Sequence, residues 1–351
     1  MNNQQPTVKS GKRKISLTAA TMLLSLISLI LTAAVSELLF SLLLCRTGPA
    51  VAFELPPIQQ PHPVLGYEIT RKDGAYFHKG LRGDGSVWEK VYTIKNGMRI
   101  TPVSNPSTRD KFLAMFGCSF VFGWACNDDE TLPARLAEYA SGYMPYNFGD
   151  CGKATQAMYW KLKTGEVRAV IAQSEGIGMY FCPGFHVRRV NLMMPESVRW
   201  THTLPEFISV GDELLFVGSM GEFYPYRMML HKLLYKSSTL RYANFNIPLQ
   251  VTEAHWDRLL LQIVASERIF KDQFTNSDFI VVLLGCGRLM DLSLLAEKLK
   301  ERGIRSIDIT SFIESAKTRH VNHEFLLPCG HPSPFMHDLI ARHLAAELAL
   351  Q

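Results

Sequence analysis

From residue 111 onward, short apolar runs alternate with longer stretches that repeat apolar residues at helical spacing. The apolar runs predict buried strands at 111–117, 144–149, 176–182, 278–285 and 304–309. The helical spacing predicts helices near 129–140, 154–172, 253–273, 289–302 and 334–350. Alternation of this kind is typical of a mainly parallel sheet with helices on both faces. The pattern therefore predicts an α/β fold, a three-layer doubly wound parallel sheet, over residues 111–351.

The N-terminal region has a different pattern. Residues 1–14 are polar and basic. Residues 15–45 are mostly apolar and carry no charge apart from Glu37, and they are long enough for a membrane-spanning helix, which needs about 20 residues. Because the basic residues precede the span, the positive-inside rule predicts a cytoplasmic N-terminus and a periplasmic or extracellular C-terminal domain, with the anchor in the inner (plasma) membrane. The small residues at 33–36 leave a cleaved signal peptide as the alternative. We favour an uncleaved anchor because the apolar region is longer than a usual signal core.

Three further segments surround or interrupt the predicted α/β domain. Residues 46–63 are proline-rich and predict a linker. Residues 64–110 hold short β-like runs between glycine turns, which predict a β-rich extension packed on the main domain. Residues 187–250 form an insertion rich in aromatic residues and methionine, in which Met228–Tyr235 is amphipathic. We expect this stretch to pack on the core, with a lid over the site or a membrane contact as the alternatives.

Composition and charge narrow the classes of partner. The chain has 351 residues, 47% of them hydrophobic and 20% charged. These fractions are typical of a globular protein that also contains one apolar segment long enough for a membrane. Part of its net charge of +5 comes from the basic N-terminal tail. There is no arginine-rich stripe and no nucleic-acid motif, so we expect no nucleic-acid partner.

Ser119 is the candidate nucleophile. It follows the predicted strand 111–117 and precedes a helix, with Gly117 and Gly123 on either side. Ligands of open α/β sheets bind outside the carboxyl ends of the strands, so a serine there is expected to be exposed. Helix N–H groups nearby could stabilise an oxyanion. The alternative is a serine in an ordinary turn between a strand and a helix.

His331 is the candidate general base. It lies in a turn rich in glycine and proline, just before the last predicted helix. A serine after the first strand and a histidine before the last helix can meet at the same sheet edge. The two residues therefore predict the nucleophile-plus-base arrangement of acyl-transfer enzymes.

At these residues the chain resembles the SGNH hydrolases, the GDSL-type esterases. The first block of that family, Gly-Asp-Ser followed later by Gly, is similar to Gly117-Cys118-Ser119-Phe120-Val121-Phe122-Gly123. Its later blocks are similar to Asn147-Phe148-Gly149-Asp150-Cys151-Gly152, Gly184-Phe185-His186 and Cys329-Gly330-His331-Pro332-Ser333. The resemblance implies that Ser119 attacks an acyl carbonyl, that His331 takes its proton, and that the N–H groups of Ser119 and Gly152 hold the oxyanion. It implies no cofactor and no metal.

The chain departs from the family pattern at three positions. Cys118 replaces the aspartate beside the nucleophile, a change associated with membrane-linked members of the family. Phe185 replaces the asparagine that donates to the oxyanion, and Cys329 or Pro328 occupies the place of the aspartate that orients the histidine. A phenylalanine donates no hydrogen bond, and a thiol is a poor substitute for a carboxylate. These changes predict a Ser-His dyad or a site that no longer turns over.

Three other polar residues are expected near the site. His186 and Arg188 follow the third predicted strand, where either could bind a substrate oxyanion or carboxylate, with a surface loop as the alternative. Asp308, at the end of the fifth strand, is the nearest spare carboxylate for His331. A backbone carbonyl is the other group that could hold the imidazole.

The chain has seven cysteines. Five of them lie at predicted strand ends or in the last loop: Cys118, Cys151, Cys182, Cys286 and Cys329. We expect small buried residues, with a disulfide in an oxidising compartment as the first alternative and a metal site as the second. The spacing matches no compact Cys-x-x-Cys site.

The resemblance and the topology together predict a membrane-anchored, SGNH-type esterase or O-acyltransferase. It would act on an O-acyl (acetyl) ester, as in an acylated carbohydrate of the cell envelope or a small ester, with the membrane contacted through residues 15–45. The alternative is a catalytically inactive SGNH-like domain that binds a glycan or a protein in an envelope assembly. The lost aspartates and asparagine favour the alternative, whereas the retained serine and histidine favour the enzyme.

Overall fold

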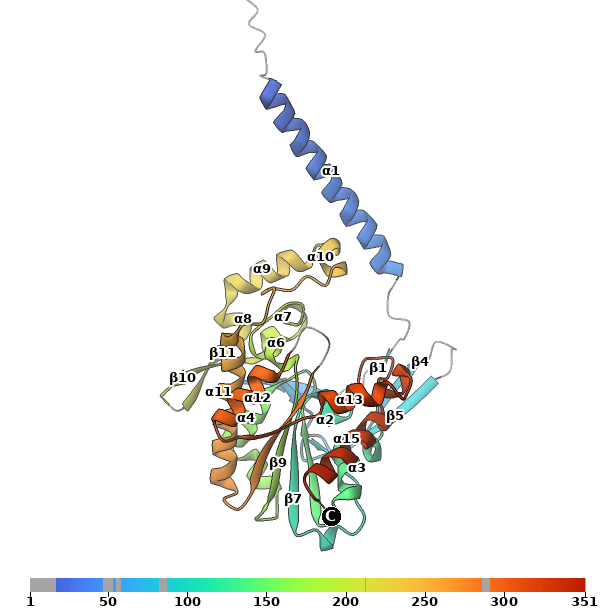
Figure 1. Cartoon of the computed structure of the whole chain (residues 1–351), viewed down its shortest axis with the longest axis vertical. Coiled ribbons are helices and arrows are strands. Elements are labelled where there is room, and N and C mark those ends of the chain that lie inside the picture. The colour runs from blue at the N-terminus through green and yellow to red at the C-terminus, as the bar shows by residue number, and fades with distance from the viewer. Residues whose placement is uncertain are drawn as a thin grey trace, which may run out of the picture. The chain divides into compact units, whose positions relative to one another are not determined.

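The computed structural model describes residues 17–46, 53–54, 58–81, 87–211, 213–285 and 291–350 (Figure 1). The chain divides into two compact units. One contains the N-terminal helix together with residues 235–244, and the other contains the remainder of the chain from residue 49. The predicted tail at 1–14 and Cys286 lie outside the described residues.

A parallel five-stranded sheet forms the centre of the larger unit. Its strands are β7 (Lys111–Gly117), β8 (Tyr143–Gly149), β9 (Gly176–Pro183), β12 (Asp278–Leu284) and β13 (Arg305–Asp308). They pair in the order β8-β7-β9-β12-β13, and every pairing among them is parallel. The predicted strands are confirmed, with ends shifted by one residue at most. Strand β8 lies on one side of β7 and β9 on the other, so the order in which strands are added reverses at β7. The crevice outside the carboxyl end of β7 is therefore the expected ligand position.

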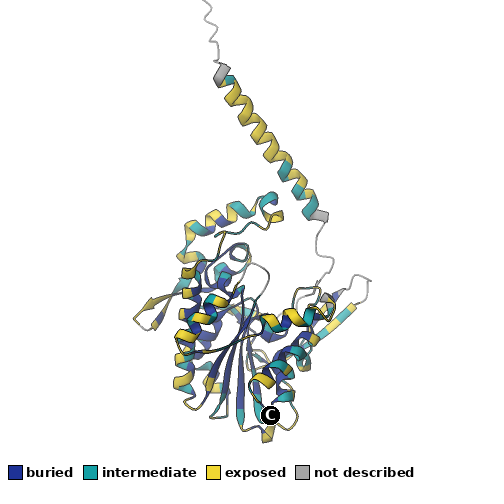
Figure 2. Cartoon of the chain, in the orientation of Figure 1, coloured by how far each residue is buried: buried dark blue, intermediate teal, exposed yellow. Residues whose placement is uncertain are grey.

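Helices cover both faces of this sheet (Figure 1). One face packs against α4 (Thr155–Lys163), α11 (Glu253–Gln273) and α12 (Ser293–Glu301), and the other packs against α3 (Leu132–Tyr139), α13 (Thr310–Lys317) and α15 (Pro334–Glu347). Along β7, Phe112 and Phe116 enter the first core while Leu113 and Met115 enter the second. Successive strand side chains point to opposite faces, so a strand buried on both sides is apolar throughout, and Figure 2 shows the sheet as buried.

One predicted helix is broken in two in the structure, and one helix was not predicted. The helix expected at 154–172 is broken into α4 and α5 (Glu166–Val170), because Gly165 adopts a left-handed φ of 76° between them. The pattern did not predict α13, whose amphipathic stretch is short. Short helices also occur at α2 (Ser119–Phe122) and α14 (Asn322–Phe325), and 3-10 turns at Pro106–Thr108, Asp128–Glu130 and Thr201–Thr203.

The β-rich extension continues the main sheet. Its strands β4 (Gly74–Leu81), β5 (Val87–Lys95) and β6 (Met98–Arg99) are antiparallel, and β6 pairs with β8 through Arg99 and Asn147. The two-residue strand β1 (Phe53–Glu54) pairs with β4 at the outer edge. A separate hairpin is formed by β2 (Gln59–His62) and β3 (Gly66–Ile69). The extension therefore joins the parallel sheet at its β8 edge, one strand away from β7, the strand that precedes Ser119.

The insertion forms several small elements. They are α6 (His186–Val190), α7 (Glu196–Arg199), the hairpin of β10 (Pro205–Val210) and β11 (Glu213–Ser219), α8 (Met220–Phe223) and α9 (Pro225–Tyr235). In α9 only Met228 and His231 are buried. Four of its other apolar residues are exposed at helical spacing: Tyr226 (83%), Met229 (67%), Leu230 (45%) and Leu233 (65%). Core packing therefore accounts for one side of this helix and leaves an apolar stripe on the other.

The smaller unit is built on α1 (Leu17–Arg46). Its segment Ala19–Leu44 has a mean hydropathy of 2.2, which by length and composition suits a membrane span or a signal sequence. The carboxylate of Glu37 accepts hydrogen bonds from the Ser237 hydroxyl and from the backbone N–H of Ser238 at 2.6 Å. These residues open α10 (Ser238–Tyr242). The one acidic residue of the apolar segment is thus satisfied by the insertion.

Candidate active site

Ser119 lies at the first position of α2, immediately after β7. The adjacent strand β8 ends at Gly149, where a Cβ atom would lie 2.2 Å from the backbone nitrogen of Phe122. Only glycine permits this close approach, so β8 packs directly against the turn that carries the serine. The sequence predicted an exposed serine, but the side chain is only 6% exposed. The difference arises because the last loop of the chain covers it.

The covering loop brings His331 to the serine. The Nε2 atom of His331 lies 3.0 Å from Ser119 Oγ. The loop is closed by the backbone N–H of Leu327, which donates to His331 O at 2.8 Å, and it ends where the Ser333 hydroxyl caps α15. The sequence placed these two side chains within hydrogen-bond reach, and the structure has that geometry.

Burial sets the protonation state of His331. It lowers the pKa of the imidazole to about 4, with the backbone of Cys329 opposing the decrease and the charge of Arg189 adding to it. The ring is therefore neutral at ordinary pH and can accept the Ser119 proton through Nε2. Its other nitrogen, Nδ1, is buried and has no hydrogen-bond partner among the described residues. No carboxylate orients this histidine within the described part of the chain.

Two backbone N–H groups at the site are unused. Within the described ranges, neither Ser119 N nor Gly152 N donates a hydrogen bond to a protein group. Gly152 has a left-handed φ of 78°, and Trp200 Nε1 donates to its carbonyl at 2.9 Å. The Asp150 N–H donates to Gly117 O at 2.9 Å and holds this loop against the end of β7. Free N–H groups held in this way can stabilise a developing oxyanion.

Aromatic rings surround the pair. The rings of Phe120 and Trp124 each lie 6.0 Å from the His331 ring, and Phe120 contacts Phe185 edge-on at 5.5 Å. The position of the expected asparagine is thus occupied by an apolar ring. Cys118 is fully buried. Burial raises the pKa of the Cys329 thiol, which therefore supplies no negative charge at ordinary pH.

Three residues expected near the site are held elsewhere. The buried His186 shares a 2.7 Å hydrogen bond with Tyr180 OH, and burial lowers its pKa well below the usual value. Arg188 pairs with Glu196 at 2.9 Å. Asp308 is exposed, accepts from Thr310 N at 2.8 Å and has no bond to His331. The sequence placed these residues correctly at strand ends, but their local partners draw them away from the serine.

Arg189 and His78, which the sequence did not indicate, lie near His331 instead. Arg189 lies over the Phe185 ring at 4.5 Å and has an electrostatic effect on His331. It lies four residues after Phe185, so the helical period could have placed both on one face. His78, on β4, packs 4.9 Å from Trp124. No pattern in the sequence indicated His78, because β4 itself was not predicted.

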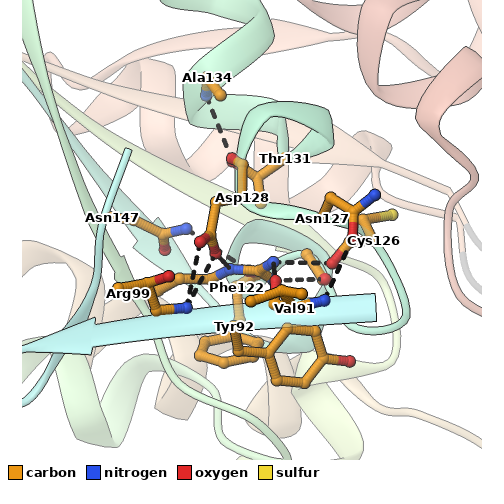
Figure 3. A network of polar contacts seen from close by, with 12 residues as sticks. Val91, Tyr92, Arg99, Phe122, Cys126, Asn127, Asp128, Thr131, Ala134 and Asn147 are labelled. Carbon is orange, nitrogen blue, oxygen red and sulfur yellow. Dashed lines mark hydrogen bonds and ion pairs between the residues drawn. The ribbon is translucent and has the colours of Figure 1, made fainter. Parts of the chain in front are cut away.

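A buried arginine of the extension supports the nucleophile turn (Figure 3). Arg99 is 2% exposed and donates to Asp128 Oδ1 at 2.8 Å. Its remaining donors contact the carbonyls of Val91, Phe122, Gly123 and Cys126 at 2.7–3.1 Å. All five N–H groups of the guanidinium are thereby used. The extension thus holds the chain that leaves Ser119.

The cysteines and the donor groups indicate no metal centre in the described part of the chain. Among the described residues, no disulfide joins any two of Cys118, Cys126, Cys151, Cys182 and Cys329. The first four are buried, as expected for small core residues. Among the described residues, no cluster of three His, Cys, Asp or Glu side chains could hold an ion.

Comparison with known proteins finds similarity only at the level of structure. No family model matches the sequence, and no curated protein matches it. The structure is similar to a lipolytic G-D-S-L family protein from Veillonella parvula, with 14% identity, a TM-score of 0.40, and 68% of this chain and 97% of that chain covered. It is also similar to a variant of the acetylxylan esterase Axe2 from Geobacillus stearothermophilus, with 12% identity, a TM-score of 0.37 and coverages of 72% and 98%.

A third similar structure is a two-domain esterase active on acetylated mannans, with 10% identity, a TM-score of 0.41 and coverages of 70% and 50%. The G-D-S-L name is the one that the sequence motifs suggested. At these identities and TM-scores the likeness carries no assignment of activity.

Proposed function

We propose that the protein is an SGNH-type ester hydrolase or O-acyltransferase that works through a Ser119-His331 dyad. The observation that carries the proposal is the 3.0 Å contact between Ser119 Oγ and His331 Nε2 at the carboxyl end of β7. The substrate class is an O-acyl ester, with an acetylated carbohydrate of the cell envelope as the preferred case. The names of the similar esterases agree with that class.

In the proposed mechanism, Ser119 Oγ attacks the acyl carbonyl while its proton moves to His331 Nε2. The N–H groups of Ser119 and Gly152 stabilise the resulting oxyanion. Collapse of the intermediate expels the alcohol, which takes the proton from His331 and leaves an acyl-serine. Water or an acceptor hydroxyl then attacks the acyl-serine while His331 accepts its proton, and His331 returns that proton to Ser119 Oγ as the acyl group leaves. The first acceptor completes hydrolysis and the second completes transfer.

We further propose that α1 anchors this domain to the inner (plasma) membrane, with the C-terminal domain periplasmic or extracellular. The hydropathy of Ala19–Leu44 and the basic residues before it support this topology. The exposed apolar stripe of α9 is a second support, because exposed apolar patches mark interaction surfaces. The residues that follow α9 pack on α1 and satisfy Glu37. A reporter enzyme fused after Gln351 should be active only outside the cytoplasm.

The test of catalysis is labelling of the full-length protein, in detergent, with a fluorophosphonate probe. We expect wild-type protein to be labelled and Ser119→Ala to be unlabelled. Ser209→Ala is the matched control, because Ser209 is an exposed serine of β10. Labelling that survives Ser119→Ala would place the reactive serine elsewhere.

The alternative, an inactive glycan- or protein-binding domain, has one observation in its favour. His331 Nδ1 lacks the carboxylate that usually stabilises the imidazolium. If wild-type protein neither reacts with the probe nor hydrolyses any of several acyl esters, the binding function replaces the enzymatic one.

A further inference from the structure

Arg189 lies beside the loop that carries Gly152. Its Nη1 donates to the carbonyl of Lys153, the next residue, at 2.7 Å. Its guanidinium also lies 5.8 Å from the ring of Trp200, whose indole N–H donates to Gly152 O. Two independent contacts therefore place this cation next to the proposed oxyanion donor.

The same guanidinium borders the aromatic wall of the site. It lies 4.5 Å from the ring of Phe185, which contacts Phe120, the residue after the nucleophile. Arg189 is thus between Phe185 and Trp200, on the side of the Ser119-His331 pair where Gly152 lies. Its charge opposes protonation of His331, which agrees with that placement.

Among the described residues, the positive charge of Arg189 has no partner of opposite sign. The residue is 9% exposed, and no carboxylate of the described chain lies within ion-pair distance of it. Its Nε is buried without an acceptor. The neighbouring Arg188 is paired with Glu196, and the buried Arg99 is paired with Asp128. Burying an unpaired guanidinium is costly. The buried Arg109 also lacks a carboxylate partner, but it donates to four backbone carbonyls, whereas Arg189 donates to one within the described chain.

Nearby residues increase the excess of positive charge. Lys153 is fully buried, with its ammonium donating to the carbonyl of Leu65 at 2.9 Å, and burial lowers its pKa to about 8. The buried Asp150 is already paired with Lys161 at 3.3 Å. The pairing of Asp150 with Lys161 leaves Lys153 and Arg189 without a carboxylate in ion-pair contact among the described residues, although Glu68, itself paired with Arg71, acts on Lys153 electrostatically.

We propose that Arg189 forms a subsite for a carboxylate of the ester substrate. A guanidinium presents paired N–H donors that match a carboxylate, and an incoming anion would satisfy both the charge and the unused donors. The inference rests on the proposed ester chemistry at Ser119 and specifies its substrate as an acidic ester. The carboxylate belongs either to the sugar, as in an acetylated acidic polysaccharide, or to the acyl group.

The experiment compares charged and neutral esters on the full-length protein in detergent. O-acetylated polygalacturonate is paired with O-acetylated xylan, and 4-nitrophenyl hemisuccinate is paired with 4-nitrophenyl butyrate. We expect Arg189→Gln to lower kcat/KM about ten-fold or more on the charged member of one pair, through loss of charge-assisted hydrogen bonds, and less on its neutral member. The first pair reports a sugar carboxylate and the second an acyl carboxylate. Arg189→Lys should recover part of the loss.

Arg199→Gln is the matched control, because Arg199 is an exposed arginine of α7 and its replacement changes the net charge equally. It should not separate charged from neutral esters. An equal loss on both members of each pair would overturn the subsite and indicate a role in holding the Gly152 loop. No loss on any ester would overturn it as well.

Binding without turnover separates this inference from the proposed catalysis. Calorimetry with unesterified oligogalacturonate and with succinate should show weaker binding to Arg189→Gln than to wild type for one of the two ligands. If wild-type protein hydrolyses no ester but retains this difference, the catalytic function fails and the subsite stands. If neither ligand distinguishes the two proteins, the subsite is wrong.

Discussion

Ser119 Oγ and His331 Nε2 lie 3.0 Å apart although 212 residues separate them along the chain. Strand β7 delivers the serine to the edge of the parallel sheet, and the turn before α15 delivers the histidine to the same edge. The far side of the imidazole differs from that of a complete triad, because Nδ1 is buried without a partner among the described residues.

The first prediction concerns pH. Burial lowers the pKa of His331 to about 4, and the base must be unprotonated to accept the serine proton. We therefore expect kcat/KM on a neutral ester to fall as the pH drops through about 4, and to be level between that pH and neutrality. A pH profile of kcat/KM measures this directly. An acid limb near the ordinary histidine pKa of 6.5 would contradict the assigned environment.

The second prediction concerns the missing carboxylate. Cys329→Asp introduces a carboxylate beside His331, where it can stabilise the imidazolium as it forms. Loss of the orienting aspartate from a complete triad lowers kcat by about 10⁴-fold. We therefore expect Cys329→Asp to raise kcat by about ten-fold or more on a small acetyl ester. The carboxylate should also raise the pKa of His331 and move the acid limb of the profile to higher pH.

Two variants control the Cys329→Asp experiment. Asp308→Asn should leave activity unchanged, since Asp308 is exposed and accepts from Thr310 N rather than from His331. Ser119→Ala should abolish activity in both backgrounds. If wild type and Cys329→Asp both equal Ser119→Ala across several acyl esters, the binding-domain alternative is adopted.

The third prediction concerns the support of the nucleophile turn by Arg99 (Figure 3). Arg99→Met leaves the Asp128 carboxylate and several carbonyls without their donor. Breaking a buried ion pair in this way should lower the free energy of unfolding by about 3–5 kcal/mol. Urea unfolding followed by tryptophan fluorescence measures the change. Arg342→Met breaks a surface pair whose arginine side chain is 66% exposed, and should cost about 1 kcal/mol or less.

An Arg99→Met variant no less stable than Arg342→Met would show that the network does not hold the turn. Reactivity provides a second measurement. Because the guanidinium contacts the carbonyls of Phe122 and Gly123, its loss should also slow fluorophosphonate labelling of Ser119. The Arg342→Met protein should label at the wild-type rate.

The fourth prediction concerns the apolar stripe of α9. If the stripe contacts a bilayer, tryptophans introduced as Met229→Trp and Leu233→Trp should be quenched by brominated lipids in reconstituted nanodiscs. Quenching is measured as the difference from wild type, which has five tryptophans of its own. Val210→Trp is the control, on an exposed apolar position of the β10–β11 hairpin. Equal quenching at all three positions, or none at any, would refute a specific contact through α9.

Much of the fold was predictable because its signals are local. Each parallel strand is a short apolar run, and each covering helix repeats apolar residues at helical spacing. The strand-turn-helix around Ser119 and the turn before α15 are likewise encoded by neighbouring residues. The sequence predicted the positions of both residues and their meeting at one sheet edge.

The failures share a different cause. Arg188 and Asp308 stand at strand ends as expected, yet Glu196 and Thr310 hold them away from the pair. The break of α4 at Gly165 and the burial of Ser119 under the last loop were also missed. The helix break follows from the left-handed φ of Gly165, whereas the other outcomes depended on which of several local or distant partners a residue meets.

The sequence by itself determined the order of strands and helices, the apolar N-terminal segment, and the two residues placed to act as nucleophile and base. Only the tertiary structure decided that Arg99 supports the serine turn, that Arg189 rather than Arg188 lies beside Gly152, and that His331 Nδ1 has no carboxylate. The physical reason is that strand and helix periods are properties of adjacent residues. Contacts such as Arg99 with Phe122 join segments that meet only after the sheet has assembled.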